Sequence, residues 1–303
     1  MKNKKPKLER VAVVAKSHAK EAPGVAKDLQ AWLQQRGVTV LLESGLATKV
    51  GGSASFSLDR LPKDVDMCIV LGGDGTLLSV ARAMRSRQIP ILGANLGSLG
   101  FLTDVALKDL YTTLETVLAG DVDVERRAIL TAELERKGET ILTERVLNDT
   151  VITKGAIARI IEISVEVDGQ FVALVRADGL IVSTPTGSTA YSLGAGGPIL
   201  HPNVDAMILT PICPHTLTYR PVVIPDSANV CLTLRGDPGE VYATFDGQVS
   251  EPMLPGDVIK IRKSRNAVKL VRIPEKNYFH VLRHKLRWAE RPRGRRSSAL
   301  PKP

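Results

Sequence analysis

The sequence predicts two domains: an α/β domain with a mostly parallel sheet, followed by a β-rich domain of two packed sheets. Over residues 10–120, strand-like apolar runs alternate with segments of helical spacing, which is typical of a parallel sheet covered by helices. From about Asp123 the alternation of apolar and polar residues takes over, and β-branched residues become frequent, as in antiparallel sheets. At 303 residues the chain is long enough for two separate cores.

Each element of the first half has its own pattern. Short apolar runs predict strands at Arg10–Ala15, Val38–Leu42, Met67–Leu71 and Ile89–Ala94. Apolar residues three and four positions apart predict helices at Gly24–Arg36, 77–87 and Leu107–Leu118. Between them, Thr48–Lys63 is polar and rich in Gly and Ser, which predicts a mobile loop.

In the second half, alternating patterns predict strands at Ile129–Leu134, Glu139–Val146, Ile160–Val167, Phe171–Val175, Arg176–Leu180 and Val230–Leu234. Asp168-Gly169 and Asp246-Gly247 stand between such runs and predict tight hairpins. Apolar residues recur at helical spacing over Tyr278–Trp288, which predicts a final helix. We therefore expect the first domain at residues 1–122 and the second at 123–272.

The basic residues are concentrated in the two ends of the chain. Residues 1–10 and 283–303 together carry a charge of +11, whereas the whole chain carries +9, so residues 11–282 carry −2. Only 4% of the residues are aromatic. A nucleic-acid partner is therefore not expected, because the body lacks both a basic surface and stacking side chains. The ends are interpreted as a flexible basic arm at 1–9 and a disordered basic tail at 291–303.

The cysteines and the apolar runs indicate where the protein works. Cys68, Cys213 and Cys231 are odd in number, widely spaced and without a CxxC pair, which favours a reducing compartment and argues against structural zinc. The apolar run Val11–Ala15 is too short for a signal peptide, and no run reaches the roughly 18 residues of a membrane span. We expect a cytoplasmic protein without a membrane partner.

The chain is organised around the turn Gly72-Gly73-Asp74-Gly75-Thr76, which joins a predicted buried strand to a predicted helix. Its glycines allow the backbone to approach a ligand closely, and the amides of the following helix can bind phosphate. Asp74 would suit a hydroxyl that is about to receive phosphate. The alternative is a tight turn in which Asp74 caps the helix. There is no GxGxxG after a predicted strand and no GxxxxGK[ST], so neither a dehydrogenase nor a Walker-type NTPase is indicated.

Two further runs carry polar or glycine-rich turns. The run from Asn95 to Leu102 follows a predicted strand and brings backbone close to the same sheet edge, although a purely structural turn explains it equally well. Thr184–Tyr191 has the sequence TPTGSTAY, a turn rich in hydroxyl groups. A nucleophilic serine is not indicated, because no GxSxG is present. His201 and His215 neighbour prolines in loops, and structural roles are expected for them.

Together, GGDGT, the run from Asn95, Asn148-Asp149, TPTGSTAY and Asp246-Gly247-Gln248 resemble the NAD kinases in order and approximate spacing. GGDGT alone is shared with diacylglycerol kinases and phosphofructokinases, whereas TPTGSTAY joined to Asn148-Asp149 is specific. The resemblance spans roughly residues 10–290. It implies an N-terminal Rossmann-like domain, a C-terminal β-sandwich that binds NAD, and a segment at 273–290 that packs back on the first domain. It also implies a homodimer or homotetramer with sites completed across subunits.

The resemblance also implies site residues. Asp74 would be the catalytic proton acceptor, and Asn148 and Asp149 would hold the adenosine part of NAD. The dinucleotide would be lined by the turn Thr189, Ala190, Tyr191, Ser192, Leu193 and Gly194, although relatives often have a serine where Gly194 stands. Further nucleotide contacts are expected from Gly72, Gly73, Gly75, Thr76, Arg159, Arg176, Asp178 and Gln248. Asp178 is expected to reach NAD bound mainly to a neighbouring subunit.

The implied reaction is ATP + NAD → ADP + NADP, with phosphoryl transfer to the 2′-hydroxyl of the adenosine ribose. No acidic cluster suggests a dedicated metal site, so Mg²⁺ is expected to be held largely by ATP. A carboxylate is too weak a base to remove a sugar-hydroxyl proton before attack. Asp74 is therefore expected to orient the hydroxyl and accept its proton late. Two alternatives are a lipid or sugar kinase of the wider GGDGT superfamily, and a non-catalytic nucleotide-binding regulator.

Overall fold

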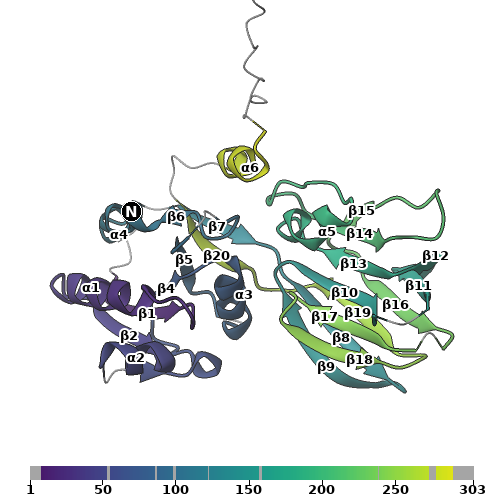
Figure 1. Cartoon of the computed structure of the whole chain (residues 1–303), viewed down its shortest axis with the longest axis horizontal. Helices are drawn as coiled ribbons and strands as arrows, with labels where there is room; N and C mark the ends of the chain where they lie inside the picture. Colours follow the sequence, from purple (N-terminus) through teal and green to yellow (C-terminus); the bar gives the residue numbers. More distant parts are fainter. Residues whose placement is uncertain are drawn as a thin grey trace, which may run out of the picture.

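The computed structural model describes residues 8–52, 55–85, 87–97, 100–121, 123–156, 159–237, 239–272 and 278–288. Figure 1 shows an N-terminal part in which helices cover a sheet, and beside it a part built almost entirely of strands. The predicted fold class is confirmed, with a parallel-sheet domain first and an antiparallel β-rich domain second. None of the helices in the described ranges is long and apolar enough to cross a membrane.

The first sheet has the strand order β3-β2-β1-β4-β5-β20-β7, with β6 paired to β5. Its strands are β1 Arg10–Ala15, β2 Thr39–Glu43, β3 Ser55–Phe56, β4 Met67–Leu71, β5 Pro90–Asn95, β6 Val105–Ala106, β7 Asp123–Arg127 and β20 Val268–Arg272. All the pairings are parallel except that of β20 with β7. The carboxyl ends of β1, β4 and β5 therefore lie at one edge.

Helices cover both faces of this sheet because each inner strand is apolar on both sides. Val13 and Val14, successive residues of β1, belong to different apolar clusters on opposite faces. One cluster includes residues of α1 (Ala22–Gln34), α2 (Ser44–Val50) and α4 (Leu110–Leu118), which follows the short helix η2 (Leu107–Asp109). The opposite cluster includes residues of α3 (Asp74–Ala83). The arrangement leaves the amino end of α3 at the sheet edge.

The second domain consists of two antiparallel sheets. One has the order β15-β14-β13-β10-β17-β18 and the other β12-β11-β16-β19-β8-β9. The first six are β10 Asp149–Lys154, β13 Gly179–Ser183, β14 Ala206–Ile212, β15 Val222–Pro225, β17 Val241–Phe245 and β18 Val249–Met253. The second six are β8 Leu130–Arg136, β9 Glu139–Val146, β11 Ile161–Val167, β12 Gln170–Ala177, β16 Val230–Arg235 and β19 Val258–Lys263. Side chains from both sheets, among them Ile152, Phe245, Ile163 and Leu232, form one core between them.

Three local predictions differ from the structure. The expected loop Thr48–Lys63 contains the end of α2, strand β3 and the short helix η1 (Leu58–Arg60), because Phe56 and Leu61 are buried against the sheet. The expected strand Arg176–Leu180 is broken at Asp178, where the chain passes from β12 in one sheet to β13 in the other. The helix expected over 77–87 ends at Ala83.

The range expected for the second domain begins and ends with strands of the first sheet. β7 and β20 lie far apart in the chain but pair with each other, and β20 continues the parallel sheet beside β5. Neither segment is among the predicted strands, and a local pattern of residues does not encode pairing between segments so far apart in the chain. Both predicted hairpins are present, at Asp168-Gly169 between β11 and β12 and at Asp246-Gly247 between β17 and β18, with positive φ at all four residues.

The predicted C-terminal helix is present as α6, Tyr278–Leu286. Val281 and Leu282 are buried, and the Tyr278 hydroxyl donates a hydrogen bond to the Leu200 carbonyl of the second domain, at 3.0 Å. Figure 1 shows α6 above the junction of the two domains. The basic arm, except for residues 8 and 9, and the tail at 291–303 lie outside the described residues.

Candidate active site

The GGDGT turn follows the buried strand β4, as expected. Gly73 is the N-cap of α3 in an extended conformation, and Asp74 is the first residue of the helix. A β-carbon at Gly72 would lie 2.7 Å from the Thr76 hydroxyl oxygen, so only glycine fits there. The amino end of α3 lies at the sheet edge, where helix amides such as those of Asp74 and Gly75 can bind an anion.

The Asp74 side chain is bound by the loop after β5 instead of capping its own helix. Its Oδ2 accepts a hydrogen bond from Phe101 N at 2.9 Å, and its Oδ1 accepts from Leu102 N and Thr103 N, both at 3.0 Å. The Thr103 hydroxyl also donates to Oδ1 at 3.0 Å. Among the described residues, all the hydrogen bonds of this carboxylate come from that loop and none comes from an amide of α3. The carboxylate therefore has a fixed position and orientation.

This loop can reach Asp74 only because position 100 has no side chain. A β-carbon at Gly100 would lie 2.0 Å from Asp74 Oδ1 and 2.4 Å from the Thr103 hydroxyl oxygen. The buried Asn95 supports the same loop from β5, since its amide donates to the Thr103 hydroxyl at 2.9 Å and its Oδ1 accepts from Gly97 N at 2.7 Å. The glycine-rich run from Asn95 is thus part of the Asp74 site.

A cavity of about 460 Å³ opens in front of the turn. Backbone of Gly72, Gly73 and Gly97 forms part of its wall, and the side chains of Lys16 and Lys285 line it from the end of β1 and from α6. Glu21 adds one acidic group. Two ammonium groups and a helix amino end around a glycine-lined cavity are suited to a chain of phosphates. The sequence did not single out either lysine as a site residue, although Lys16 directly follows a strand whose carboxyl end meets the GGDGT edge.

Asp149 is the first residue of β10 and Asn148 directly precedes it, and the carboxylate of Asp246 holds the backbone of both. Asp246 Oδ2 accepts from Leu147 N at 2.9 Å, while Oδ1 accepts from Asn148 N at 2.7 Å and Asp149 N at 3.2 Å. Asp149 is 4% exposed. Burial, and then the neighbouring charge of Asp246, raises the pKa of Asp149 to about 7. Burial also raises the pKa of Asp246, partly offset by its backbone hydrogen bonds.

The TPTGSTAY turn packs directly against Asn148. The Thr184 hydroxyl donates to the Leu147 carbonyl at 2.6 Å, and Thr184 N donates to the Asn148 carbonyl at 2.9 Å. A β-carbon at Gly187 would lie 2.1 Å from that same carbonyl oxygen, so the approach requires glycine. The structure thus brings Asn148 and this turn together.

The residues expected to line the dinucleotide differ in the groups they present. Thr189 ends a short 3-10 helix, and Tyr191–Gly194 forms α5. Tyr191 is 48% exposed, and a β-carbon at Gly194 would meet open space. Ser192 is fully buried, with its hydroxyl 2.9 Å from that of Thr210. Ser192 therefore supports the fold of this turn, and its contact with the dinucleotide stays a prediction.

Gln248 joins the two halves of the site. Its side-chain nitrogen donates to the Gly75 carbonyl at 2.7 Å, and its oxygen accepts from the Ser79 hydroxyl at 3.1 Å. Asp246, two residues earlier, holds the backbone of Asn148. The Asp246–Gln248 hairpin therefore fixes the GGDGT turn relative to the adenosine-binding residues expected in the second domain.

Three expected contact residues lie elsewhere and are engaged differently within this chain. Arg176 Nε lies 3.2 Å from Glu162 Oε1 on the neighbouring strand, and the Arg176 side chain is 62% exposed. Asp178 Oδ1 lies 2.8 Å from Lys154 Nζ. Arg159 is exposed. Their roles in binding remain predictions.

A buried cluster of charged side chains lies next to the TPTGSTAY turn and was not predicted from the sequence. Arg127 of β7 is 3% exposed and donates to Glu125 Oε2 at 2.8 Å and to the Thr186 hydroxyl at 3.3 Å. Arg272 of β20 donates to the same Glu125 oxygen at 2.7 Å and to Asp104 Oδ2 at 2.5 Å. Burial, and then the nearby Arg272, lowers the pKa of Arg127 to about 10. The cluster connects the first sheet to the TPTGSTAY turn.

Within the described residues, no group of three or more His, Cys, Asp or Glu side chains is arranged to hold a metal ion. Asp74, the one carboxylate in the GGDGT turn, is engaged by the loop at 101–103. This donor set does not suit a metal ion held by the protein alone.

Comparison with known proteins agrees with this arrangement. The family model of the ATP-NAD kinase N-terminal domain matches residues 11–122, and that of the ATP-NAD kinase C-terminal domain matches residues 147–273. The NAD kinase of Geobacter sulfurreducens is 51% identical over 284 residues, covering 94% of this chain and 100% of that protein. The NAD kinase of Koribacter versatilis is 46% identical over 285 residues, with the same coverage.

Two solved structures are similar. The NAD kinase of Archaeoglobus fulgidus in complex with ATP has a TM-score of 0.74 and 26% identity, covering 92% of this chain and 98% of that one. Yeast NADH kinase complexed with NADH has a TM-score of 0.87 at 24% identity, covering 96% of this chain and 91% of that one, and shares the fold. From the two family models and the near full-length relatives, the chain belongs to the NAD kinase family.

Proposed function

We propose that the chain catalyses ATP + NAD → ADP + NADP, using MgATP to phosphorylate the 2′-hydroxyl of the adenosine ribose of NAD. The main support for this proposal is the Asp246–Gln248 hairpin, because it contacts both the GGDGT turn and the backbone of Asn148. Asp246 binds the backbone of Asn148, and Gln248 binds the Gly75 carbonyl next to Asp74. One tight turn thus holds the expected proton acceptor against the expected acceptor-binding residues.

Asp74 would orient the attacking hydroxyl. A carboxylate oxygen has two lone pairs. Oδ1 already accepts three hydrogen bonds, whereas Oδ2 accepts one from Phe101 N. Oδ2 is therefore the oxygen proposed to accept the 2′-hydroxyl hydrogen bond and, late in the transfer, its proton. Fixing the carboxylate beforehand lowers the entropic cost of aligning the hydroxyl with the phosphoryl group.

The phosphates of ATP would lie in the cavity in front of the GGDGT turn. Lys16, Lys285 and the amides at the start of α3 supply positive charge there. Mg²⁺ would enter as part of the MgATP substrate, bound by phosphate oxygens and water, because the described side chains offer no carboxylate cage. In that position it would neutralise charge that develops during transfer.

The adenosine of NAD would lie between Asn148, Asp149 and the TPTGSTAY turn. Asn148 can pair its amide with an adenine edge, and the half-exposed Tyr191 ring offers an apolar face. Arg159, Arg176 and Asp178 are proposed to act on NAD bound mainly by a neighbouring subunit of a homodimer or homotetramer. We propose that the protein works in the cytoplasm in NADP biosynthesis, without a nucleic-acid or membrane partner.

One assay tests the reaction. The pure protein is incubated with ATP, Mg²⁺ and NAD, and NADP is measured with an NADP-specific dehydrogenase. We expect NADP only when all three components are present. Omission of Mg²⁺, and replacement of Asp74 by Asn, serve as controls for metal-dependent and Asp74-dependent turnover.

The same preparation separates the alternatives. A lipid or sugar kinase would form ADP with diacylglycerol or a sugar and leave NAD unchanged. A non-catalytic regulator would bind nucleotide and form neither ADP nor NADP. Either result would overturn the proposed function.

A further inference from the structure

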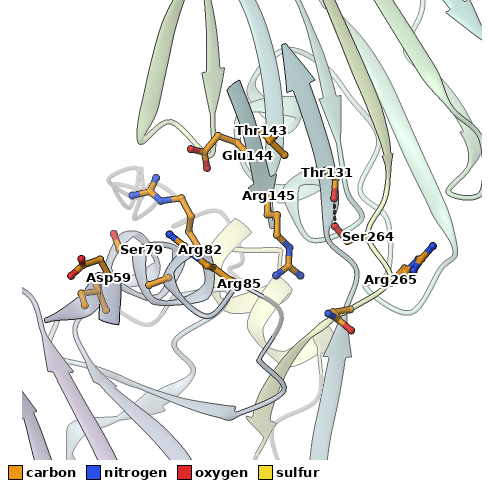
Figure 2. Close-up of a pocket in the computed structure, with 13 residues that line it drawn as sticks. Asp59, Ser79, Arg82, Arg85, Thr131, Thr143, Glu144, Arg145, Ser264 and Arg265 are labelled. Carbon is orange, nitrogen blue, oxygen red and sulfur yellow. Dashed lines mark hydrogen bonds between the residues drawn. The ribbon is translucent and has the colours of Figure 1, made fainter. Parts of the chain in front are cut away.

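A second cavity, of about 790 Å³, lies between the domains and shares no lining residue with the cavity at Asp74. Figure 2 shows it bounded by α3 on one side and by β9 and the turn after β19 on the other. The first domain contributes residues from the C-terminal half of α3 and just after it, away from the end that carries Asp74. These are Ser79, Arg82 and Arg85. Much of the opposite wall comes from β9 and from the turn after β19. β9 contributes Thr143, Glu144 and Arg145, and the turn contributes Ser264, Arg265 and Asn266.

Four arginines dominate this cavity. Arg82 and Arg85 come from the first domain, and Arg145 and Arg265 come from the second. Among the described residues, no carboxylate forms a salt bridge with any of the four. Nη1 of Arg82 is buried without a hydrogen-bond partner in that same part of the chain. The positive charge of Arg82 acts on Asp246 through space.

The rest of the described lining offsets only part of this charge. Its two acidic residues are Asp59 and Glu144, and Asp59 also forms a salt bridge with Arg60, which does not line the cavity. Arg145 is half-buried, and burial lowers its pKa. Arg82 and Arg145 are partly removed from water, where a charged group without a partner is costly, so an anion that pairs with them would stabilise the protein. Arg85 and Arg265 are exposed and add positive charge to the same cavity.

The chemistry of the wall favours phosphate. Guanidinium groups bind phosphate oxygens through two parallel hydrogen bonds, and the hydroxyls of Ser79, Thr131, Thr143 and Ser264 can add further donors. No aromatic side chain of the described residues lines the cavity, so this lining offers no platform for stacking a base. Its volume falls in the range of small-molecule sites.

We propose that this cavity binds a small anion with two or more linked phosphate groups, held by Arg82 and Arg85 from one domain and Arg145 and Arg265 from the other. The bound anion would join the far end of α3 to the second domain. Because the near end of α3 carries Asp74, and Ser79 is hydrogen-bonded to Gln248, such a ligand would restrict movement between the two halves of the active site. The proposal is independent of NAD phosphorylation.

The test uses pyrophosphate and tripolyphosphate as probes, measured by calorimetry in the presence of saturating NAD and low salt. Arg145→Gln and Arg265→Gln remove charges outside the catalytic site. Arg235→Gln, an exposed arginine at the end of β16 that does not line the cavity, is the matched control. We expect each cavity variant to weaken binding about tenfold or more, since each loses a charge-assisted hydrogen bond, and the control to bind like the wild type.

Two further measurements test the same cavity. The probes should raise the Tm of the wild type clearly more than that of the Arg145→Gln/Arg265→Gln double variant, whose remaining rise would come from phosphate bound at the GGDGT turn. Arg265 is exposed, so its single variant should fold even if the double variant does not. ATP as a third probe distinguishes a nucleotide from a free phosphate chain: because ATP is also proposed to bind at the GGDGT turn, a second binding event that the wild type shows and the same variants lack indicates that nucleotides also enter this cavity. Absence of probe binding to the wild type, equal affinity in the cavity variants, or an equal loss in Arg235→Gln would overturn the proposal.

Discussion

The side-chain nitrogen of Gln248 lies 2.7 Å from the carbonyl oxygen of Gly75, so a residue of the second domain closes a turn of the first. The same side chain accepts a hydrogen bond from Ser79 one turn further along α3. The contact lies between the hairpin that positions Asn148 and the helix that begins at Asp74. Relative movement of the two domains would therefore alter both halves of the candidate site.

Gln248→Ala should lower the free energy of unfolding by roughly 1–2 kcal/mol, because two hydrogen bonds are lost. It should also lower kcat, since Asp74 and the acceptor would be aligned less often. The measurements are denaturant unfolding and steady-state kinetics. Gln170→Ala is the matched control, because Gln170 follows the other Asp-Gly hairpin and is exposed. Equal effects of the two substitutions would show that the interdomain bonds contribute nothing.

Asp74→Asn should lower kcat by roughly 10²–10⁴, the usual contribution of a positioned acid–base group. An amide also turns one acceptor into a donor, which would face the backbone N–H groups at 101–103 and weaken that loop. Thr103→Val separates the two effects, because it removes the bonds of this hydroxyl to Asp74 and Asn95 and keeps the carboxylate. Near-normal kcat in Asp74→Asn, or an equal loss in Thr103→Val, would contradict the catalytic role.

Asn148→Ala should weaken NAD binding far more than ATP binding, because it removes an amide expected to pair with adenine. The backbone at this position should keep its conformation, since Asp246 and Thr184 bind the Asn148 N–H and carbonyl, not its side chain. Calorimetric titration with NAD and with ATP measures the difference. Asn203→Ala, at an exposed position, is the control. Unchanged NAD affinity would remove Asn148 from the site.

Asp149 should make stability depend on pH. Its pKa is about 7 in the folded protein, against a reference value of 3.8, so the folded state binds the proton more tightly. The free energy of unfolding should therefore fall as pH rises from about 4 to about 7 and change little above that. Asp149→Asn mimics the protonated form and should raise the Tm relative to wild type at about pH 8, but much less at about pH 5.

Thermal unfolding of wild type and Asp149→Asn across this range is the measurement. Asp121→Asn, an exposed position just after α4, controls for loss of a surface charge. If the difference in Tm between wild type and Asp149→Asn does not change with pH, the Asp149 carboxyl does not titrate in this window.

Local patterns determined the fold class and the motifs. The apolar run Met67–Leu71 and the glycines after it predicted a strand ending in a phosphate-binding turn, because burial and close backbone approach leave few other residue types possible. The period-2 alternation after Asp123 predicted the antiparallel domain, and the two Asp-Gly pairs predicted hairpins. These are short-range effects, in which neighbouring residues constrain one another.

Only the tertiary structure decided which partners these segments take. Whether Asp74 caps α3 or binds the loop at 101–103 depends on how β5 returns beside β4, which periodicity does not encode. Three contacts join residues that are far apart in the chain. β7 pairs with β20 in the first sheet, the buried Arg127 donates to Thr186 of the TPTGSTAY turn, and Gln248 donates to the Gly75 carbonyl. The physical reason is that hydrogen bonds and charge pairs of this kind form only after the packing of distant elements brings their groups together.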